Sequence, residues 1–390
     1  MRILFSTYPG LGHVNPLLPL ARALADAGHI VRFATGADSC QRVSMAGFHP
    51  VPAGLTLAAG QHLVLAEYPE LRDVPSEDRA EFLFGTLFGE IAPRRRLPDL
   101  LAIARSWQPD LIVHEPTEYA APLIAELLDI PSALHAWGPV LPHALIRAGA
   151  RAAEAMWVEH ALSPRDDGGM YRGLYLDICP RSMQSDKPPT RAIALRPGAG
   201  DVLPGDRWDP ATFPEASGPA VVITFGSIFH EDTTGLAMVA RAVDILGGAS
   251  VIAAGRPPES IGDLPESARA FRYLPISLAL EHGDAFVTHG GASSIMAAAR
   301  SGCPALVIPQ GADHHLNAAA AYRSGFARLL PKEEFTQERI VSELRHIQGD
   351  ALLRDRARSA RSEIEAMPDA ADIVVELESY VCDGGRDPHV

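Results

Sequence analysis

Short apolar runs alternate with amphipathic stretches along this chain, and this alternation restricts its possible folds more than any other sequence feature. Residues 2–7 form an apolar run, residues 16–27 carry leucines at helical spacing before Gly28, and residues 30–34 form a second run. Runs of this length are typical of buried parallel strands. The order strand, helix, strand predicts a βαβ unit with a right-handed crossover.

The same alternation continues to the end of the chain. It predicts strands at residues 111–113, 132–136, 220–225, 250–254, 285–288 and 305–308, and helices at residues 120–128, 235–246, 292–301, 338–366 and 370–380. We therefore expect an α/β protein with two doubly wound, Rossmann-like domains that face a central cleft. Ligands of such folds bind beyond the carboxyl ends of the strands.

A glycine- and proline-rich segment at residues 197–219 is typical of a domain linker. We expect an N-terminal domain over residues 1–200, a linker over residues 201–218 and a C-terminal domain over residues 219–366. The last helix, within residues 367–390, is expected to cross back to the N-terminal domain.

The composition is that of an acidic globular protein. The 390 residues include 34 Lys and Arg against 48 Asp and Glu, which gives a net charge of −14. Such a surface repels phosphate backbones and anionic lipids, so we expect neither nucleic-acid nor membrane binding. We also expect no signal peptide and no transmembrane helix. The four cysteines are far apart in the sequence, which fits the cytosol and argues against a zinc site.

One predicted strand-to-helix junction in the C-terminal half reads His289-Gly290-Gly291. Two glycines allow a ligand to approach the backbone closely, and a helix start offers free N–H groups at its positive dipole end. This combination predicts an anion site, most naturally for phosphate. Ser294 and His289 can add donors. The alternative is a tight turn with a helix cap.

A second strand end in the same half, Thr224-Phe225-Gly226-Ser227, places another hydroxyl at the same edge of the predicted sheet. No Walker lysine accompanies either junction. We therefore expect a diphosphate that binds without a P-loop.

The first predicted strand-to-helix turn contains Gly10, Gly12 and His13. Gly10 and Gly12 match part of a dinucleotide fingerprint, but Asn15 replaces its third glycine and no acidic residue directly follows the second strand. An NAD site is therefore disfavoured. His13, at the mouth of the predicted cleft, can take a proton from a substrate hydroxyl as a general base. The alternative is a histidine that caps the helix.

A histidine base works better when a carboxylate orients its imidazole. The strand at residues 111–113 ends in His114-Glu115, with Glu118 just beyond. We expect Glu115 to be the catalytic partner of His13, with Glu118 as second choice. The alternative is that these carboxylates only cap the following helix.

Aromatic residues gather in two stretches outside the βα alternation, residues 55–98 and 137–175. They include Phe82, Phe84, Phe88 and Trp137, which we predict to bind an apolar acceptor. The alternative is that each of them is part of the core.

The whole chain resembles the inverting, nucleotide-sugar-dependent glycosyltransferases of family 1, which have the GT-B fold. It looks most similar to bacterial enzymes that glycosylate macrolides, aromatic polyketides and other natural products. The motifs that carry this resemblance are Pro9-Gly10-Leu11-Gly12-His13-Val14-Asn15-Pro16, Phe225-Gly226-Ser227, Tyr273-Leu274-Pro275, His289-Gly290-Gly291, Gly302-Cys303-Pro304, Pro309, Asp313, Asn317 and Met367-Pro368.

The resemblance implies an acceptor domain at the N-terminus and a nucleotide-sugar domain at the C-terminus, with His13 as catalytic base. It also implies that Asp313 and its neighbour His314 bind hydroxyls of the donor sugar, and that Tyr273 and Leu274 bind the nucleobase. The residues implied to hold the diphosphate are Ser227, His289, Gly290, Gly291, Ser293 and Ser294. It implies no cofactor and no metal, because helix dipoles and hydroxyls hold the phosphates.

This sequence departs from the family pattern at three positions. Ser293 replaces a glycine of the phosphate turn, Tyr273 replaces a stacking tryptophan, and His314 replaces a glutamine. A histidine offers fewer hydrogen bonds than a glutamine, and a sugar that lacks hydroxyls would leave no polar group unpaired beside it. We therefore expect the donor sugar to be a 6-deoxyhexose or a more highly deoxygenated sugar, and the resemblance implies that dTDP activates it, so that the enzyme prefers it over UDP-glucose. The alternative is that His314 replaces glutamine with equivalent bonding.

Two other functions fit the same architecture. One is a non-catalytic auxiliary or binding protein, and the other is a nucleotide-sugar epimerase. The expected partners are a nucleotide-sugar donor and an apolar small-molecule acceptor, and a homodimer is a fair expectation for an enzyme of this kind.

Overall fold

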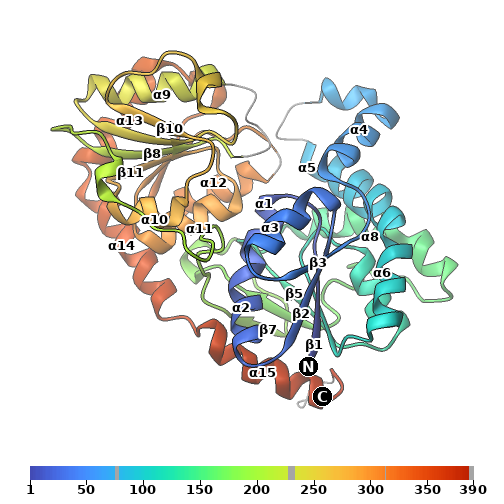
Figure 1. Cartoon of the computed structure of the whole chain (residues 1–390). Coiled ribbons are helices and arrows are strands. Elements are labelled where there is room, and N and C mark those ends of the chain that lie inside the picture. Colours follow the sequence, from blue (N-terminus) through green and yellow to red (C-terminus); the bar gives the residue numbers. More distant parts are fainter. Residues whose placement is uncertain (75–78, 227–232, 312, 386–390) are drawn as a thin grey trace. The chain divides into compact units, whose positions relative to one another are not determined.

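A computed structural model describes residues 1–74, 79–226, 233–311 and 313–385 (Figure 1). The chain divides into two compact units. Unit 1 consists of Met1–Cys179, Ser185–Gly200 and Met367–Val390, and unit 2 consists of Pro180–Gln184 and Asp201–Ala366. Unit 2 therefore includes residues 201–218, which the sequence analysis assigned to a linker.

The described part of unit 1 contains a seven-stranded parallel sheet with the strand order β3-β2-β1-β4-β5-β6-β7. Its strands are β1 (Arg2–Ser6), β2 (Ile30–Thr35), β3 (His49–Pro52), β4 (Leu111–His114), β5 (Ser132–His135), β6 (Leu174–Asp177) and β7 (Ala192–Ala194). The strand order reverses at β1, which pairs with both β2 and β4. The carboxyl ends of β1 and β4 therefore lie side by side, with Ser6 opposite His114.

Helices surround the unit 1 sheet and bury its apolar strands. They are α1 (Leu11–Val14), α2 (Leu18–Asp26), α3 (Cys40–Met45), α4 (Leu57–Glu67), α5 (Arg79–Leu83), α6 (Ala92–Trp107), α7 (Ala120–Leu127), α8 (His143–Glu159) and α15 (Ala370–Cys382), with a π-helical segment η4 (Phe84–Ile91) between α5 and α6. The segment η4 packs on α8, where Gly89 and Gly149 let the two backbones approach. A Cβ atom at Gly89 would lie 2.5 Å from the carbonyl oxygen of Gly149. This close packing positions the aromatic residues of η4 described below.

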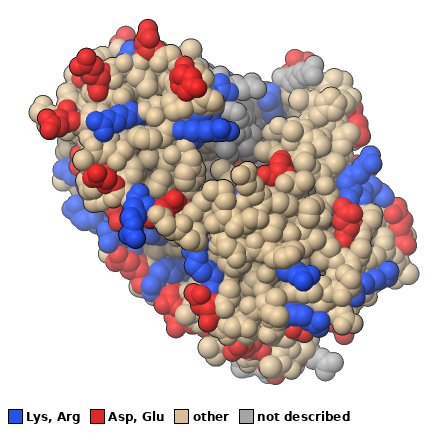
Figure 2. Space-filling model, in the orientation of Figure 1, with Lys and Arg blue, Asp and Glu red and all other residues tan. Residues whose placement is uncertain are grey.

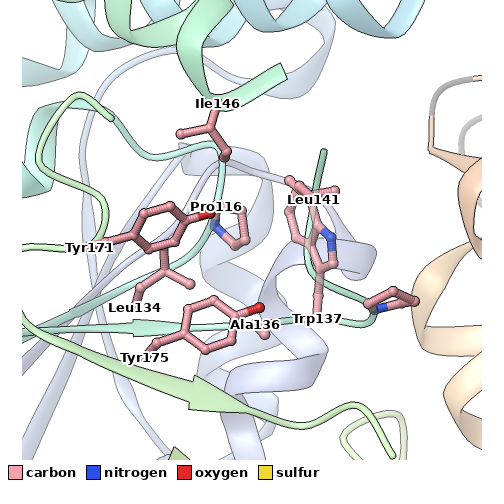
Figure 3. Close-up of a pocket in the computed structure, with 9 residues that line it drawn as sticks. Pro116, Leu134, Ala136, Trp137, Leu141, Ile146, Tyr171 and Tyr175 are labelled. Carbon is pink, nitrogen blue, oxygen red and sulfur yellow. The ribbon is translucent and has the colours of Figure 1, made fainter. Parts of the chain in front are cut away.

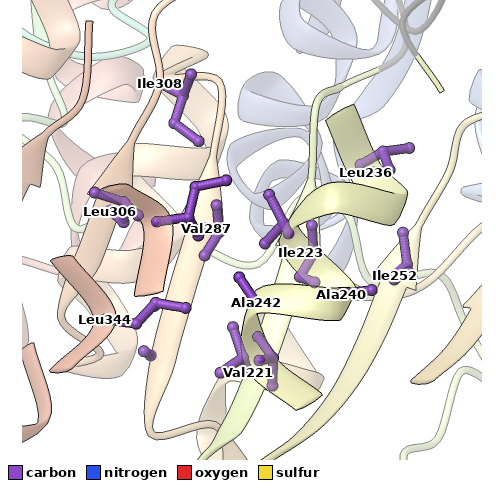
Figure 4. Close-up of a cluster of buried hydrophobic side chains, with 14 of the residues drawn as sticks. Val221, Ile223, Leu236, Ala240, Ala242, Ile252, Val287, Leu306, Ile308 and Leu344 are labelled. Carbon is purple, nitrogen blue, oxygen red and sulfur yellow. The ribbon is translucent and has the colours of Figure 1, made fainter. Parts of the chain in front are cut away.

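The described part of unit 2 contains a six-stranded parallel sheet with the order β10-β9-β8-β11-β12-β13. The strands are β8 (Ala220–Thr224), β9 (Ala249–Ala253), β10 (Ala268–Phe271), β11 (Ala285–Thr288), β12 (Ala305–Val307) and β13 (Ala327–Leu329). Aliphatic side chains from the strands and from the helices over them form its core (Figure 4). Val221, Ile223 and Val287 are fully buried there.

The helices of unit 2 are α9 (Thr233–Ile245), α10 (Ile276–Ala279), α11 (Ala292–Ser301), α12 (His314–Arg323), α13 (Gln337–Gly349) and α14 (Ala351–Glu365). The prediction of one continuous helical stretch over residues 338–366 is wrong, because two helices meet at Asp350. The Asp350 carboxylate accepts a hydrogen bond from the Leu353 backbone N–H at 3.0 Å and caps α14. A glycine followed by aspartate is a typical signal for one helix to end and another to begin.

The C-terminal helix α15 belongs to unit 1, where it packs against α2. Asp369 and Asp372 form a capping box at its start. The Arg196 backbone N–H donates to the Pro368 carbonyl at 2.7 Å, and the Arg196 guanidinium donates to the Met367 carbonyl at 3.0 Å. These bonds fix the segment that leads into α15.

The predicted fold class is confirmed, since both units are doubly wound parallel α/β structures. The alternation did not predict the four edge strands β3, β7, β10 and β13, nor the interior strand β6. Edge strands face solvent on one side, so their sequences need not be continuous apolar runs. In β3, two of the four residues are prolines, which sheets tolerate at an edge.

Acidic and basic side chains are interspersed on the face of the molecule drawn in Figure 2. No described helix is both long and apolar enough to cross a membrane. No disulfide bond joins the four cysteines, all of which lie among the described residues.

Candidate functional site

The turn after β1 places His13 at the carboxyl edge of the unit 1 sheet. Gly10 enters this turn with φ of 128°, a conformation that favours glycine, and α1 follows directly. The imidazole Nδ1 of His13 lies 3.4 Å from Oε1 of Glu115, which follows β4. His13 keeps 14% of its side chain exposed, whereas Glu115 is buried. The structure therefore brings together the two residues predicted as a catalytic pair.

Four donors surround the Glu115 carboxylate. The backbone N–H of Tyr8 donates to Oε1 at 3.0 Å, and the backbone N–H of Thr117 donates to Oε2 at 2.7 Å. The Thr117 hydroxyl lies 2.8 and 2.9 Å from the two oxygens, and His13 supplies the fourth group. Burial raises the pKa of Glu115, but the charge and hydrogen bond of His13, with the N–H groups of Thr117 and Tyr8, outweigh it and lower the pKa below its usual value. The carboxylate stays charged beside the imidazole.

Thr117 is a member of this site that the sequence analysis missed. A turn links Glu115 to Glu118, because the Glu118 N–H donates to the Glu115 carbonyl at 3.0 Å. Pro116 takes the second position of this turn, where its fixed φ is favoured. The turn places the Thr117 hydroxyl over the Glu115 side chain. The signal in the sequence was the tetrapeptide Glu-Pro-Thr-Glu directly after a buried strand.

Glu118, the second candidate partner of His13, has a different environment. Its carboxylate lies 2.8 Å from Nη1 of Arg96, and both side chains are almost fully buried. It also accepts hydrogen bonds from the Ser6 hydroxyl at 3.0 Å and from the Ala120 N–H at 3.1 Å. Glu118 therefore closes a buried ion pair and caps α7.

Asn15, which occupies the third-glycine position of the dinucleotide pattern, is also buried. Its side-chain oxygen accepts a hydrogen bond from Nε of Arg42 at 2.8 Å, and Arg42 donates to the Gly200 carbonyl at 2.8 Å. Here the residue fixes the turn that carries His13.

Aromatic rings pack around His13. Its ring centroid lies 4.8 Å from that of Trp137, 5.4 Å from Tyr8 and 6.3 Å from Phe88. Phe84 is buried, and its ring centroid lies 5.5 Å from that of Phe88. The structure thus brings three of the four predicted acceptor residues, Trp137, Phe88 and Phe84, into one aromatic group with His13.

Phe82, the fourth predicted acceptor residue, packs edge-on against Tyr68, with 5.1 Å between the two ring centroids. Both belong to a hydrophobic cluster that also includes Tyr8 and Phe88. Phe82 therefore packs in the same hydrophobic cluster, where it contacts Tyr68.

A small pocket opens beside Trp137 in unit 1 (Figure 3). Its volume is about 10 Å³, which is about the least space that one water molecule needs. The rings of Tyr171 and Tyr175 form one side, and their centroids lie 6.0 Å apart. The residues that line it are Pro116, Leu134, Ala136, Trp137, Pro139, Leu141, Ile146, Tyr171 and Tyr175. Burial raises the pKa of Tyr171 to about 12, so the phenol is neutral and can donate.

In unit 2, the turn after β11 leads from His289 into α11. A Cβ atom on Gly291 would lie 2.7 Å from Nε2 of His289, and one on Gly226 would lie 2.5 Å from the same atom. The two glycines therefore let the imidazole fit between the turns that follow β8 and β11. This side chain faces the loops that the sequence analysis predicted to hold a diphosphate.

The predicted phosphate residues Gly290 and Gly291 precede the first helical residue of α11, and Ser293 and Ser294 lie in its first turn. The Ser293 hydroxyl oxygen is buried. The Ser294 N–H donates to the Gly291 carbonyl at 2.9 Å. Ser227, the other predicted hydroxyl donor, lies outside the described residues.

His289 and His314 form a buried pair of neutral imidazoles. Their ring centroids lie 4.6 Å apart at an interplanar angle of 88°. Burial, assisted by His314, lowers the pKa of His289 to about 3, and burial lowers the pKa of His314 to about 3. His314, the first residue of α12, therefore packs against the histidine of the predicted phosphate turn.

Asn317 links the predicted sugar-binding and phosphate-binding loops. Its side-chain amide lies 2.7 Å from Oδ2 of Asp313 and 3.1 Å from the Gly290 carbonyl, to both of which it donates. This arrangement holds the Asp313 carboxylate next to the glycine turn.

The two predicted nucleobase residues differ in exposure. Tyr273 is 41% exposed, and its hydroxyl donates to the Asp201 carbonyl. Leu274 is buried. The Asp201 carboxylate also accepts from the Ser277 N–H at 2.8 Å, which ties this loop to the segment that enters unit 2. Within the described residues, no cluster of His, Cys, Asp or Glu could hold a metal ion.

Comparisons with known proteins identify the family. Domain models of the erythromycin biosynthesis protein CIII-like proteins match residues 22–196 with their N-terminal domain and residues 238–380 with their C-terminal domain. The chain is also 32% identical to the L-demethylnoviosyl transferase of Streptomyces niveus over 388 residues, which is 97% of each chain. This chain belongs to the erythromycin CIII-like glycosyltransferases.

Solved structures of similar glycosyltransferases have the same GT-B fold. The glycosyltransferase SnogD from Streptomyces nogalater is 28% identical with a TM-score of 0.76, over 98% of this chain and 99% of that one. The glycosyltransferase VinC, solved in complex with dTDP, is 26% identical with a TM-score of 0.77, over 98% of this chain and all of that one. The predictions of a GT-B fold and of a glycosyltransferase are confirmed.

Proposed function

We propose that this glycosyltransferase moves a deoxysugar from a dTDP-sugar to a hydroxyl of an apolar natural product, with inversion at the anomeric carbon. His13 is the general base of the proposed reaction. The observation that carries this proposal is the contact of the partly exposed His13 imidazole with the buried, charged Glu115 carboxylate.

The chemistry follows from this contact. The acceptor hydroxyl gives its proton to His13 while its oxygen attacks the anomeric carbon. The bond from that carbon to the diphosphate oxygen breaks, and the leaving diphosphate takes its electron pair. One direct displacement inverts the centre. Glu115 stabilises the imidazolium that forms and remains ionised itself.

The donor part of the proposal rests on unit 2. The first turn of α11 offers backbone N–H groups and the positive end of its dipole to a diphosphate. Ser294 adds a hydroxyl, and Tyr273, which is 41% exposed, is an aromatic residue of the kind that stacks on a base. The similarity to a transferase solved with dTDP favours thymine as this base.

The choice of a deoxysugar rests on Asp313 and His314. Asp313 is an acceptor for one sugar hydroxyl, held by Asn317 at 2.7 Å. His314 is buried and packs on His289, so less of its ring is open for bonding to a sugar. A fully hydroxylated hexose would lose a hydrogen bond at this position, whereas a deoxysugar would not.

The acceptor part rests on the aromatic group around His13. Tyr8, Phe88 and Trp137 present an apolar wall beside the base. The pocket between Trp137 and Tyr171 holds about 10 Å³. That space admits about one water molecule, so we infer that the acceptor contacts the aromatic group around His13 and does not enter this pocket.

The first test replaces His13 by alanine. We expect the variant to fold and to lose about 10²–10⁴-fold in kcat, the usual contribution of a general base. His282→Ala, which removes an exposed histidine of unit 2, is the control and should keep full activity. Turnover of His13→Ala within threefold of the parent enzyme would exclude the base assignment.

A second test separates transfer from other functions. Donor consumption is measured with and without a panel of apolar aglycones. A transferase consumes donor in step with product only when acceptor is present. An epimerase would convert donor alone, and a binding protein would consume none.

The donor assignment is tested by competition between a dTDP-deoxysugar and UDP-glucose. We expect the parent enzyme to prefer the deoxysugar and His314→Gln to shift the ratio toward glucose. A preference for UDP-glucose that His314→Gln leaves unchanged would reject both the donor and the role of His314.

A further inference from the structure

We propose that the Thr117 hydroxyl is a positioning group that sets the tautomer of His13, by accepting a hydrogen bond from Nδ1 while it donates to Glu115. This inference rests on the proposed role of His13 as general base. It adds a third member, from the turn after β4, to the pair of His13 and Glu115.

Counting protons gives the direction of each bond. The Thr117 hydroxyl carries one hydrogen, and its oxygen lies 2.8 and 2.9 Å from the two oxygens of the ionised Glu115. A carboxylate only accepts, so this hydrogen points to Glu115. The Thr117 oxygen therefore presents a lone pair to Nδ1 of His13, 3.4 Å away.

A lone pair facing Nδ1 fixes the state of the imidazole. Nδ1 must carry the hydrogen, because both groups that it faces, Oγ1 of Thr117 and Oε1 of Glu115, are acceptors at 3.4 Å. In the neutral ring, Nε2 is then left without hydrogen. This is the nitrogen that can take the proton of a substrate.

Glu115 alone would set the tautomer weakly. Its distance of 3.4 Å from Nδ1 is longer than the 2.9–3.0 Å at which N–H···O bonds are most frequent. Two acceptors that share one N–H restrict the ring more than one distant carboxylate. The Thr117 hydroxyl also lies within hydrogen-bonding distance of both oxygens of Glu115. It therefore orients the Glu115 carboxylate as well as the His13 ring.

The turn makes this arrangement rigid. Pro116 restricts the backbone between Glu115 and Thr117, and both of these residues are buried. The Thr117 backbone N–H also donates to Glu115, at 2.7 Å. That bond does not depend on the side chain, so a substitution can remove the hydroxyl and keep the carboxylate in place.

The test uses Thr117→Val, which keeps the shape and removes the hydroxyl, and Thr117→Ser, which keeps the hydroxyl. We expect Thr117→Val to lower kcat about tenfold, a part of the contribution of a general base, with the donor KM within twofold of the parent. Thr117→Ser should keep kcat within about twofold. Equal losses in both variants, or full activity of Thr117→Val, would overturn the proposal.

Nitrogen-15 spectra of the histidine rings provide a readout that a purely structural role would not change. His13→Ala identifies the His13 signals. We expect the parent enzyme and Thr117→Ser to show the Nδ1–H tautomer at neutral pH, and Thr117→Val to show a mixture. An Nε2–H tautomer in the parent enzyme would refute the proposal, even if the valine variant did not fold.

The proposed function and this inference can fail separately. If His13→Ala keeps its activity, the base assignment fails. If His13→Ala loses activity while Thr117→Val retains both activity and the Nδ1–H tautomer, only the role of Thr117 is wrong.

Discussion

Nδ1 of His13 lies 3.4 Å from Oε1 of Glu115 because β1 and β4 are neighbours in the sheet and both turns start at its carboxyl edge. Ser6 and His114 are opposite each other in these strands, so the residues that follow them meet. This relationship joins a partly exposed imidazole to a buried charge, which would orient the imidazole of the proposed general base.

Glu115→Gln should impair this arrangement without changing its size. The carboxylate accepts from Tyr8 and Thr117, which donate to both of its oxygens. An amide accepts on one oxygen only, so its NH₂ group would face a donor. We expect a fall of at least about tenfold in kcat and a loss of about 1–3 kcal/mol of folding free energy. Steady-state kinetics measure kcat, and urea unfolding measures the folding free energy. Glu376→Gln, at an exposed residue, is the control. A kcat of Glu115→Gln equal to that of the parent would contradict the role of Glu115.

Gly291→Ala should weaken donor binding. The added Cβ would lie 2.7 Å from Nε2 of His289, so the imidazole or the turn must move. We expect the donor KM to rise about tenfold or more, since 1.4 kcal/mol of lost binding is one factor of ten. Gly349→Ala is a matched control, because a Cβ there meets no atom within 4 Å. If both variants have the same donor KM, this turn does not contact the donor.

Removing Arg96 should destabilise unit 1 strongly. Arg96→Met leaves the buried Glu118 carboxylate without its partner at 2.8 Å, and an unpaired buried charge costs about 3–5 kcal/mol. Arg94→Met breaks an ion pair with Glu159 whose side chains are 38% and 54% exposed, so it should cost at most about 1 kcal/mol. Urea unfolding compares the two variants. A cost for Arg96→Met as small as that for Arg94→Met would show that Glu118 is not buried as a charge.

His114→Leu should change the pH dependence of stability. Burial lowers the pKa of His114 from 6.5 to about 4, although Glu115 opposes this shift. Between these values the unfolded chain binds a proton that the folded chain does not, so stability falls as the pH is lowered from 6.5 toward 4. The leucine variant lacks this loss. The difference in unfolding free energy between His114→Leu and the parent should therefore be about 2 kcal/mol more favourable to the variant at pH 5 than at pH 7.5.

Melting curves at both pH values measure this difference. The exposed His282→Leu is the control and should follow the parent curve. A difference between His114→Leu and the parent that is the same at pH 5 and pH 7.5 would contradict a buried neutral His114.

We expect transfer to proceed in excess chelator. The proposed diphosphate site consists of backbone N–H groups at the start of α11 and of hydroxyls. These donors stabilise the negative charge of the diphosphate without a metal cation. Product formation with a chelator and after addition of Mg²⁺ or Mn²⁺ measures this. An absolute requirement for added metal would reject this form of the diphosphate site.

The sequence by itself determined the α/β class, the two parallel sheets and the candidates His13, Glu115 and His289. Periodicity and strand-end motifs carry these features, because hydrophobic spacing and the position of glycines are local properties of the chain. The resemblance to glycosyltransferases rests on the same local motifs. The break at Asp350 was also visible locally, as a glycine followed by aspartate, but the helical pattern on both sides hid it.

Only the tertiary structure decided which groups meet. It placed Glu115, the preferred of the two candidate carboxylates, beside His13 and paired Glu118, the second choice, with Arg96. It brought Thr117 into the site and packed His314 against His289. These contacts depend on strand order and on the course of each turn, so they arise from packing between segments that are distant in the chain. A local pattern contains no information about such distances.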